Sequence, residues 1–257
     1  MTIIQTIILG VVEGVTEFLP ISSTGHLILF GKLLGVVDSD FTKSFDIAIQ
    51  LGAILAVVVL YWKRFLQGAD IWKKVFTAFL PTAIIGFLLY KILKQYLLSS
   101  PMLVVWALAL GGVVLIAFEW WHKKLYDVGG HTTEISYKKS FLVGLAQSLA
   151  IIPGVSRAAA TIVSGMLMGV SREAIVEFSF LLAVPTMAAA TAYDLYKSAG
   201  SFSFDQFGFL ALGFIISFIV AVVSIKWLLY FIKNHSFIWF GVYRIGVALL
   251  FFIFVVR

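Results

Sequence analysis

The chain of 257 residues contains no cysteine and only five prolines, and just 12% of its residues are charged. The absence of cysteine excludes disulfide bonds and thiol chemistry. Low charge beside 61% hydrophobic residues points to a membrane protein, because several nearly uncharged stretches approach the ~20 residues that a helix needs to cross the bilayer core. The sequence therefore predicts an all-α, polytopic membrane protein.

The distribution of charge and hydrophobicity narrows this class further. The net charge is +6, but lysine and arginine gather in short loops, which indicates membrane topology and contact with membrane lipids rather than nucleic-acid binding. The apolar stretches lack the alternation of period two that marks barrel strands. The first apolar stretch has neither a basic leader nor a small-residue cleavage pattern, so we expect it to belong to the mature protein.

The apolar stretches predict ten helices, at 3–19, 22–35, 45–62, 75–93, 101–121, 140–152, 157–169, 173–193, 206–230 and 236–256. The pieces 22–35, 140–152 and 157–169 are too short to cross a bilayer alone. Pro20 and Pro153 interrupt the two segments that contain these pieces. Because broken helices at membrane depth line cavities rather than meet lipid, we expect about six transmembrane helices and two re-entrant hairpins.

Basic residues in two loops predict how the chain lies in the membrane. If both loops are cytoplasmic, the hairpin 3–35 dips from outside, the hairpin 140–169 dips from inside, and both termini lie outside. Lys32, Lys43, Lys91 and Lys94 would then lie outside, against the rule. The residues that define the two loops are Lys63, Arg64, Lys73, Lys74, Lys123, Lys124, Lys138 and Lys139.

The two halves of the chain resemble one another. Asp46-x-x-x-Gln50 and Glu173-x-x-x-Glu177 each open an apolar helix. With three full crossings in each half, the second copy must be inverted, as in many transporters, whose sites lie between broken helices near the midplane. We expect one membrane domain made of repeat 1–121, a cytoplasmic loop 122–139 and repeat 140–257; chance likeness of apolar helices is the alternative. The other matches are Gly10, Glu13, Pro20 and Ser22 with Gly144, Gln147, Pro153 and Ser156.

Glu13 and Glu17 are four residues apart and share one helical face within the first hairpin. Ionisable groups at membrane depth are costly, so a functional role is the default interpretation. Both carboxylates can stay ionised only beside a cation, and Mg²⁺ or Ca²⁺ would also bind phosphate oxygens. The alternative is a protonated or hydrogen-bonded pair that holds helices together.

Three hydroxyl residues, Ser22, Ser23 and Thr24, follow Pro20 and precede an apolar helix. At least one of them is predicted to cap that helix, and the helix N-terminus inside the membrane would also suit a phosphate. His26 lies one turn further on. It could relay a proton, act as a nucleophile, or simply pack.

The second interruption again places a hydroxyl residue between a proline and an apolar helix, and it adds a cation. Ser156 and Arg157 follow Pro153, and Arg157 lies between two apolar stretches. A guanidinium at this depth needs an anion, either a phosphate or one of the acids Glu13, Glu17, Glu173 and Glu177. Thr161, one turn later, could add a hydroxyl to the same face. If the hairpins converge, these groups would form a metal-assisted phosphoryl site.

The remaining polar residues are assigned structural roles. The acids and amides at Asp46, Gln50, Glu173 and Glu177 support loops or line the cavity, and Arg244 pairs within the bundle. Those near predicted helix ends, where exposed or interfacial placement is expected, are Glu119, His122, His131 and His235.

The motifs Glu13-Gly-Val-Thr-Glu-Phe-Leu-Pro-Ile-Ser-Ser-Thr-Gly-His26 and Pro153-Gly-Val-Ser-Arg-Ala-Ala-Ala-Thr161 resemble the two signatures of the bacterial undecaprenyl pyrophosphate phosphatase family, the bacitracin-resistance proteins. The likeness extends over essentially the whole chain. It implies a multi-pass enzyme of the bacterial plasma (inner) membrane that hydrolyses undecaprenyl diphosphate to undecaprenyl phosphate and inorganic phosphate. That reaction recycles the lipid carrier for peptidoglycan and confers bacitracin resistance.

The resemblance also implies a divalent metal, Mg²⁺ or Ca²⁺, and a site that opens toward the periplasmic side. The residues that match the family's catalytic and binding positions are Glu13, Glu17, Ser22, Ser23, His26, Ser156, Arg157 and Thr161. One departure is Ala158, which stands where the family commonly has a second serine. The sequence leaves the nucleophile open among Ser23, His26 and water.

Two further questions stay open from the sequence. Inverted repeats with broken helices are also a transporter plan, so the competing function is a polyprenyl-phosphate transporter or flippase, alone or in addition to hydrolysis. The chain could also form a homodimer.

Overall fold

The computed structural model describes the whole chain except residues 38, 67, 93–99, 127–131, 198–206 and 254–257. The regular elements of these described residues are helices. Thr132 and Val170 also form an isolated parallel β-bridge. The helices are α1 (Ile3–Thr16), α2 (Ser23–Leu33), α3 (Asp40–Leu66), α4 (Ala69–Ile92), α5 (Pro101–Tyr126), α6 (Tyr137–Gln147), η2 (Ser148–Ile151), α7 (Arg157–Leu167), α8 (Arg172–Lys197), α9 (Phe207–Asn234) and α10 (Ile238–Phe251).

Each of the ten predicted helices has a counterpart, although α3 extends beyond its predicted range 45–62 at both ends. Residues 93, 206 and 254–256 of the predicted ranges lie outside the described residues. Five described helices, α3, α4, α5, α8 and α9, are long and apolar enough to cross a membrane. α10 is shorter, with 14 residues. The chain is therefore a multi-pass helical membrane protein.

Large apolar side chains point away from the protein along the membrane-crossing helices. Ile84 and Leu88 on α4, Val114 on α5 and Ile219 on α9 are each more than half exposed. Apolar surface of this extent is unfavourable in water but is what hydrocarbon chains contact in a bilayer. The exposed apolar faces are therefore the lipid-facing surface.

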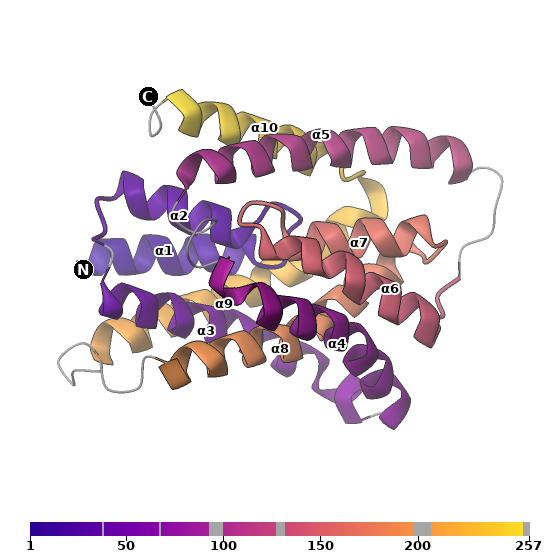
Figure 1. The fold of residues 1–257 in the computed structure, drawn as a ribbon, viewed down its shortest axis with the longest axis horizontal. Helices are drawn as coiled ribbons and strands as arrows, with labels where there is room; N and C mark the ends of the chain where they lie inside the picture. Colours follow the sequence, from indigo (N-terminus) through magenta and orange to yellow (C-terminus); the bar gives the residue numbers. More distant parts are fainter. Residues whose placement is uncertain (38, 67, 93–99, 127–131, 198–206, 254–257) are drawn as a thin grey trace.

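Two hairpins enter the bundle from its opposite ends. In Figure 1, α1 and α2 come from the end where the chain begins, whereas α6 and α7 come from the other end, and the two tips meet inside the molecule. With 14 and 11 residues, α1 and α2 reach only about 21 Å and 16 Å at 1.5 Å per residue. Each is shorter than the ~30 Å hydrocarbon core.

The two tips have the same local geometry. Ser22 and Ser156 are the N-caps of α2 and α7, and their side chains accept hydrogen bonds from Gly25 N and Ala159 N. A cap among the hydroxyls after Pro20 was predicted, and Ser22 is the one that forms it. Both serines have positive φ, at 73° and 77°, which is unusual for a residue with a side chain. The left-handed serine lets the chain reverse from one hairpin arm into the other while its hydroxyl caps the new helix.

Packing holds the hairpins against the long helices. The ring of Phe18 at the first tip meets Phe180 of α8 edge to face, with ring centroids 5.5 Å apart. At the second hairpin, Thr82 Oγ1 of α4 donates a 2.8 Å hydrogen bond to the Gly144 carbonyl. A Cβ at position 144 would overlap the carbonyl of Ala78, so the absence of a side chain there permits the close approach of α6 and α4.

Two of the expected surface positions are wrong. Glu119 and His122 are only 4% and 5% exposed. Glu119 accepts two hydrogen bonds from Arg172 and one from the backbone N of Phe237, so three elements meet around it. His235 is exposed as expected, and His131 lies outside the described residues. Position near a helix end did not reveal a partner that is distant in sequence.

We predict that Gly144→Ala lowers the melting temperature in detergent, because forcing a methyl group into a packed contact costs about 1–3 kcal/mol. Gly31→Ala is the matched control, because a Cβ there meets no atom within 4 Å and alanine favours a helix. Circular dichroism during heating measures both. Equal melting temperatures for the two variants would contradict the close α6–α4 contact.

Candidate active site

The two hairpin tips are joined by an ion pair. Glu17 follows the last residue of α1, Arg157 is the first residue of α7, and Arg157 Nη2 lies 3.4 Å from Glu17 Oε1. Their side chains are only 7% and 11% exposed, so the pair is largely shielded from solvent. Of the four acids considered as partners, Glu17 is the one that Arg157 meets, and Glu177 instead pairs with Arg64. The hairpins therefore converge on one site.

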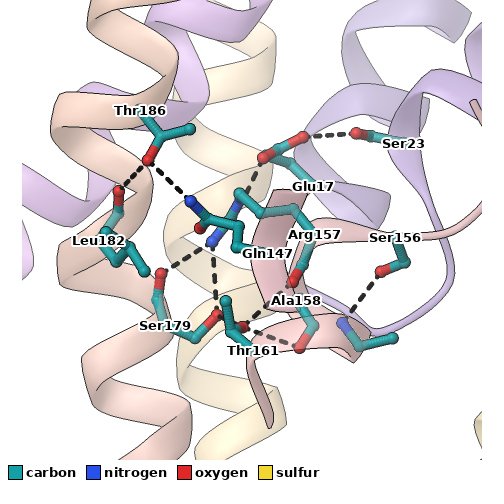
Figure 2. A network of polar contacts seen from close by, with 11 residues as sticks. Glu17, Ser23, Gln147, Ser156, Arg157, Ala158, Thr161, Ser179, Leu182 and Thr186 are labelled. Carbon is teal, nitrogen blue, oxygen red and sulfur yellow. Dashed lines mark hydrogen bonds and ion pairs between the residues drawn. The ribbon is translucent and has the colours of Figure 1, made fainter. Parts of the chain in front are cut away.

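Glu17 also receives a hydroxyl. Ser23, the first residue of α2, donates a short hydrogen bond from Oγ to Glu17 Oε2. The two carboxylate oxygens of Glu17 thus contact different partners, the guanidinium through Oε1 and the hydroxyl through Oε2 (Figure 2). A serine hydroxyl bonded to a carboxylate that can accept its proton is the arrangement of an activated nucleophile.

Arg157 is oriented by α8. Its Nη1 donates to the Ser179 carbonyl at 2.8 Å and to Ser179 Oγ at 3.3 Å, and Thr161 Oγ1 lies 2.6 Å from the same Oγ. Figure 2 shows the guanidinium between Ser179 on one side and Glu17 on the other. Ser179 was not among the predicted site residues. A serine inside the apolar run from Phe178 to Pro185 was the available signal.

Glu13 is buried without a partner. It is 0% exposed, and neither carboxylate oxygen has a hydrogen-bond partner among the described residues. It lies within electrostatic range of Glu17, Asp46 and Arg157. Because an unpaired buried carboxylate is costly, its free oxygens fit a bound cation. No described group of three acidic or histidine residues forms a complete ligand set, so other oxygens would have to complete the coordination.

The partners of His26 are different from those of the Glu17–Ser23 contact. Its Nδ1 is 2.7 Å from the Ser22 carbonyl, and its Nε2 is 3.0 Å from the hydroxyl of Tyr243, whose ring stacks on the imidazole. A carbonyl only accepts, so Nδ1 carries hydrogen and Nε2 of a neutral ring accepts from Tyr243. Both ring nitrogens are therefore engaged away from the ion pair.

The other predicted binding residues have different positions. Ser22 and Ser156 use their hydroxyls to cap α2 and α7. Thr161 is fully buried beside Ser179, whereas Thr24 is exposed and outside the polar cluster. Among the predicted hydroxyls, Ser23 is the one that contacts the acid directly.

Gln147, which the sequence matches with Glu13, also lies in the cluster. Its Nε2 donates to Thr82 Oγ1 at 2.9 Å and to Thr186 Oγ1 at 3.2 Å, while its Oε1 is buried without a partner among the described residues. Figure 2 shows the hydrogen bond between its amide and Thr186 of α8. The second hairpin thus brings an amide where the first brings an acid.

The arrangement is suited to a reaction at an anion. A guanidinium and the N-termini of α2 and α7 supply positive charge and N–H donors, which bind phosphate. A carboxylate-bound hydroxyl and a second carboxylate for a cation complete the set. Fold and site therefore define a polytopic membrane protein with a phosphoryl-transfer type of centre between two broken helices.

The comparisons with known proteins agree with this class. The chain belongs to the family described as bacitracin resistance protein BacA, whose profile matches residues 6–250. It is 53% identical over 251 residues to the undecaprenyl-diphosphatase of Aquifex aeolicus, covering 98% of each chain. It is 52% identical over 254 residues to the undecaprenyl-diphosphatase of a Sulfurihydrogenibium species, with 98% of this chain and 99% of the relative covered.

We predict that Ser179→Ala destabilises the protein by about 1 kcal/mol, because Thr161 loses a buried hydrogen-bond partner and Arg157 loses one of two acceptors on α8. Ser164→Ala is the matched control, since Ser164 donates only to the Thr161 carbonyl of its own helix. The melting temperatures in detergent measure both. A fall for the control as large as for Ser179→Ala would refute the assignment.

Proposed function

We propose that this chain hydrolyses undecaprenyl diphosphate to undecaprenyl phosphate and inorganic phosphate. The observation that carries the proposal is the hydrogen bond from Ser23 to Glu17, opposite Arg157. The substrate is taken from relatives about 50% identical over nearly the whole chain, which carry the name undecaprenyl-diphosphatase. In a bacterium this reaction would return the lipid carrier to peptidoglycan synthesis.

Ser23 is the proposed nucleophile. Its Oγ attacks the terminal phosphorus while Glu17 Oε2 takes the hydroxyl proton, and the bond to the bridging oxygen breaks. Undecaprenyl phosphate leaves with that oxygen. Water then attacks the phosphoserine, the P–O bond to Ser23 breaks, Glu17 returns its proton to Ser23 Oγ, and inorganic phosphate is released. The hydrogen bonds at both ring nitrogens of His26 favour a role in holding the tip over a role as nucleophile.

Arg157 and the helix termini bind and orient the diphosphate. The guanidinium lies beside Glu17 and keeps a buried Nε that has no hydrogen-bond partner among the described residues, so it retains a donor for a phosphate oxygen. Ser179 and Thr161 fix the other side of Arg157. Charge that develops on the phosphate is thus met by a cation that is already in position.

The cofactor we propose is a divalent cation, Mg²⁺ or Ca²⁺, held by Glu13 with Glu17. The unpaired oxygens of Glu13 support it. When bound, the ion would neutralise phosphate oxygens and complete its coordination with them. Glu13 thereby acts through charge, and Glu17 keeps its proton-accepting oxygen for Ser23.

We propose that the halves 1–121 and 140–257, joined by a cytoplasmic loop 122–139, form an inverted repeat with re-entrant hairpins. The helix contacts support it: α1 packs on α9 as α6 packs on α4, and α3 packs on α9 as α8 packs on α4. With the basic loops inside, the first hairpin enters from outside in a bacterial inner membrane. The site would open toward the periplasm.

Transport of polyprenyl phosphate is the competing function, because inverted repeats also build transporters. The names of the relatives favour hydrolysis. The two functions are separable in detergent, where a hydrolase releases phosphate and a transporter has no second compartment to fill.

We predict that purified protein in detergent with Mg²⁺ releases phosphate from undecaprenyl diphosphate, and that Ser23→Ala slows release by roughly 10³-fold or more. With substrate labelled at the terminal phosphate, acid quenching should trap label on the wild-type protein and none on Ser23→Ala. Ser224→Ala is the control, because the hydroxyl of Ser224 donates to the Val220 carbonyl of its own helix α9. Unchanged release by Ser23→Ala would reject Ser23 as nucleophile, and no release by folded wild type would reject the hydrolase.

We predict that Mg²⁺ raises the melting temperature of the wild-type protein, by an amount that corresponds to about 2.7 kcal/mol at a hundredfold excess over the dissociation constant. Glu13→Gln should lose this rise and should melt above the wild type in chelator, since a buried charge without a partner is removed. The exposed Glu134 provides the control Glu134→Gln. A metal-dependent rise that survives in Glu13→Gln would show that Glu13 is not a ligand.

A further inference from the structure

Arg244 on α10 is fully buried, with 0% of its surface exposed, and all five of its N–H groups donate to backbone carbonyls. Within the part of the chain that the structure describes, its hydrogen-bond partners are carbonyls rather than carboxylates. The bonds are Nε to Leu108 O at 3.2 Å, Nη1 to Pro20 O at 3.2 Å and Val155 O at 3.0 Å, and Nη2 to Ala107 O at 3.0 Å and Gly154 O at 2.7 Å.

These carbonyls come from three segments that meet at one point. Pro20 belongs to the first hairpin tip, Gly154 and Val155 belong to the second, and Ala107 and Leu108 lie within α5. At a tip the chain leaves the helical path, so its carbonyls lose their helical donors. Such groups are costly at membrane depth unless another donor reaches them. Arg244 supplies that donor to both tips at once.

The clamped carbonyls are close in sequence to the reacting groups. Pro20 precedes Ser23 by three residues, and Val155 precedes Arg157 by two. The residues in between are Ile21 and Ser22 at the first tip and Ser156 at the second, and the two serines are the left-handed caps. A shift of either tip carbonyl would therefore be passed to Ser23 or to Arg157.

α5 is shaped to receive the guanidinium. A Cβ at Gly111 would overlap Arg244 Nη2 and lie 2.6 Å from its Cζ. A side chain at position 111 would displace a group held by five hydrogen bonds. Gly246, two residues beyond Arg244 on α10, has no atom within 4 Å of a Cβ and so provides a matched comparison.

We propose that Arg244 is a positioning residue, which ties the two hairpin tips to each other and to α5 and so sets the distance between Ser23 and Arg157. It touches neither reacting group, and its effect is transmitted through the backbone of both tips. This inference rests on the proposed hydrolase for its kinetic consequence but not for its structural one.

The test uses the full chain, in which the absence of cysteine makes site-specific labelling clean. Spin labels on Val15→Cys in α1 and Leu149→Cys in η2 lie on exposed side chains of the two hairpins, outside the site. Pulsed electron resonance then measures the separation of the hairpins in detergent, without substrate. Phosphate release by the unlabelled protein supplies kcat and KM.

We expect Arg244→Gln to broaden and shift the label distance and to lower kcat by roughly 100-fold, as for a misplacement of about 1 Å, with a much smaller change in KM. Arg244→Lys should recover part of both, because an ammonium carries three donors. Gly111→Ala should reproduce the defect with Arg244 still present, whereas Gly246→Ala should not. Arg172→Gln, which breaks the distant pair with Glu119, should lower stability without moving the labels.

Two results would overturn the proposal. One is an unchanged label distance in folded Arg244→Gln or Arg244→Lys. The other is an unchanged distance and kcat in Gly111→Ala, which decides the matter if the Arg244 variants do not fold. A shifted distance in a protein whose wild type releases no phosphate would retain the clamp and reject the hydrolase, so the two failures are distinguishable.

Discussion

The structure depends on the cost of ending a helix inside the protein, where its backbone groups are shielded from water. Each hairpin reverses among buried side chains, so the polar groups that its backbone frees must find partners within the protein. Side chains provide these partners. Ser22 and Ser156 accept hydrogen bonds from N–H groups at the start of α2 and α7, and Arg244 donates hydrogen bonds to carbonyls of both tips. Between the tips the side chains of Glu17 and Arg157 are largely buried, so their charges interact at short range and with little screening.

Within this space two acids in the same helix have separate roles because their surroundings differ. Glu17 meets Arg157 and Ser23, so its charge is balanced and its orientation is fixed. Glu13, one turn earlier, has neither kind of partner among the described residues. The same residue type thus presents a proton acceptor at one position and an unsatisfied ligand at the other. The proposed division of work between hydroxyl activation and metal binding follows from that difference.

The sequence was sufficient for what depends on local chemistry. Apolar length predicted the helices, proline placed both interruptions, and hydroxyls after Pro20 and Pro153 predicted the caps. The sequence pattern could not identify hydrogen-bond and ion-pair partners that are distant in sequence and meet only in the folded protein. Arg157 had four candidate acids, and only the meeting of the tips selects Glu17.

Arg244 is a second residue whose partners the sequence did not reveal. We expected it to pair within the bundle, and its partners are five backbone carbonyls. Every residue has a carbonyl, so the residue types in the sequence cannot identify such partners. Glu119 was assigned to an exposed or interfacial position although Arg172, a distant residue, buries it. In each case the missing information was a contact across the fold, which the residue types on either side do not specify.

The left-handed serines also restrict which residues could replace them. A β-branched or bulky residue is strained at φ near 75°, while glycine accepts that angle but has no oxygen to cap the helix. Asparagine tolerates the angle and offers an acceptor, yet it brings an additional amide that must be satisfied in a buried site. Serine combines a small volume, a tolerable strain and a capping oxygen. In evolutionary terms, positions 22 and 156 have a very small set of permitted residues, even though the hydroxyl at each contacts the backbone and not the reacting groups.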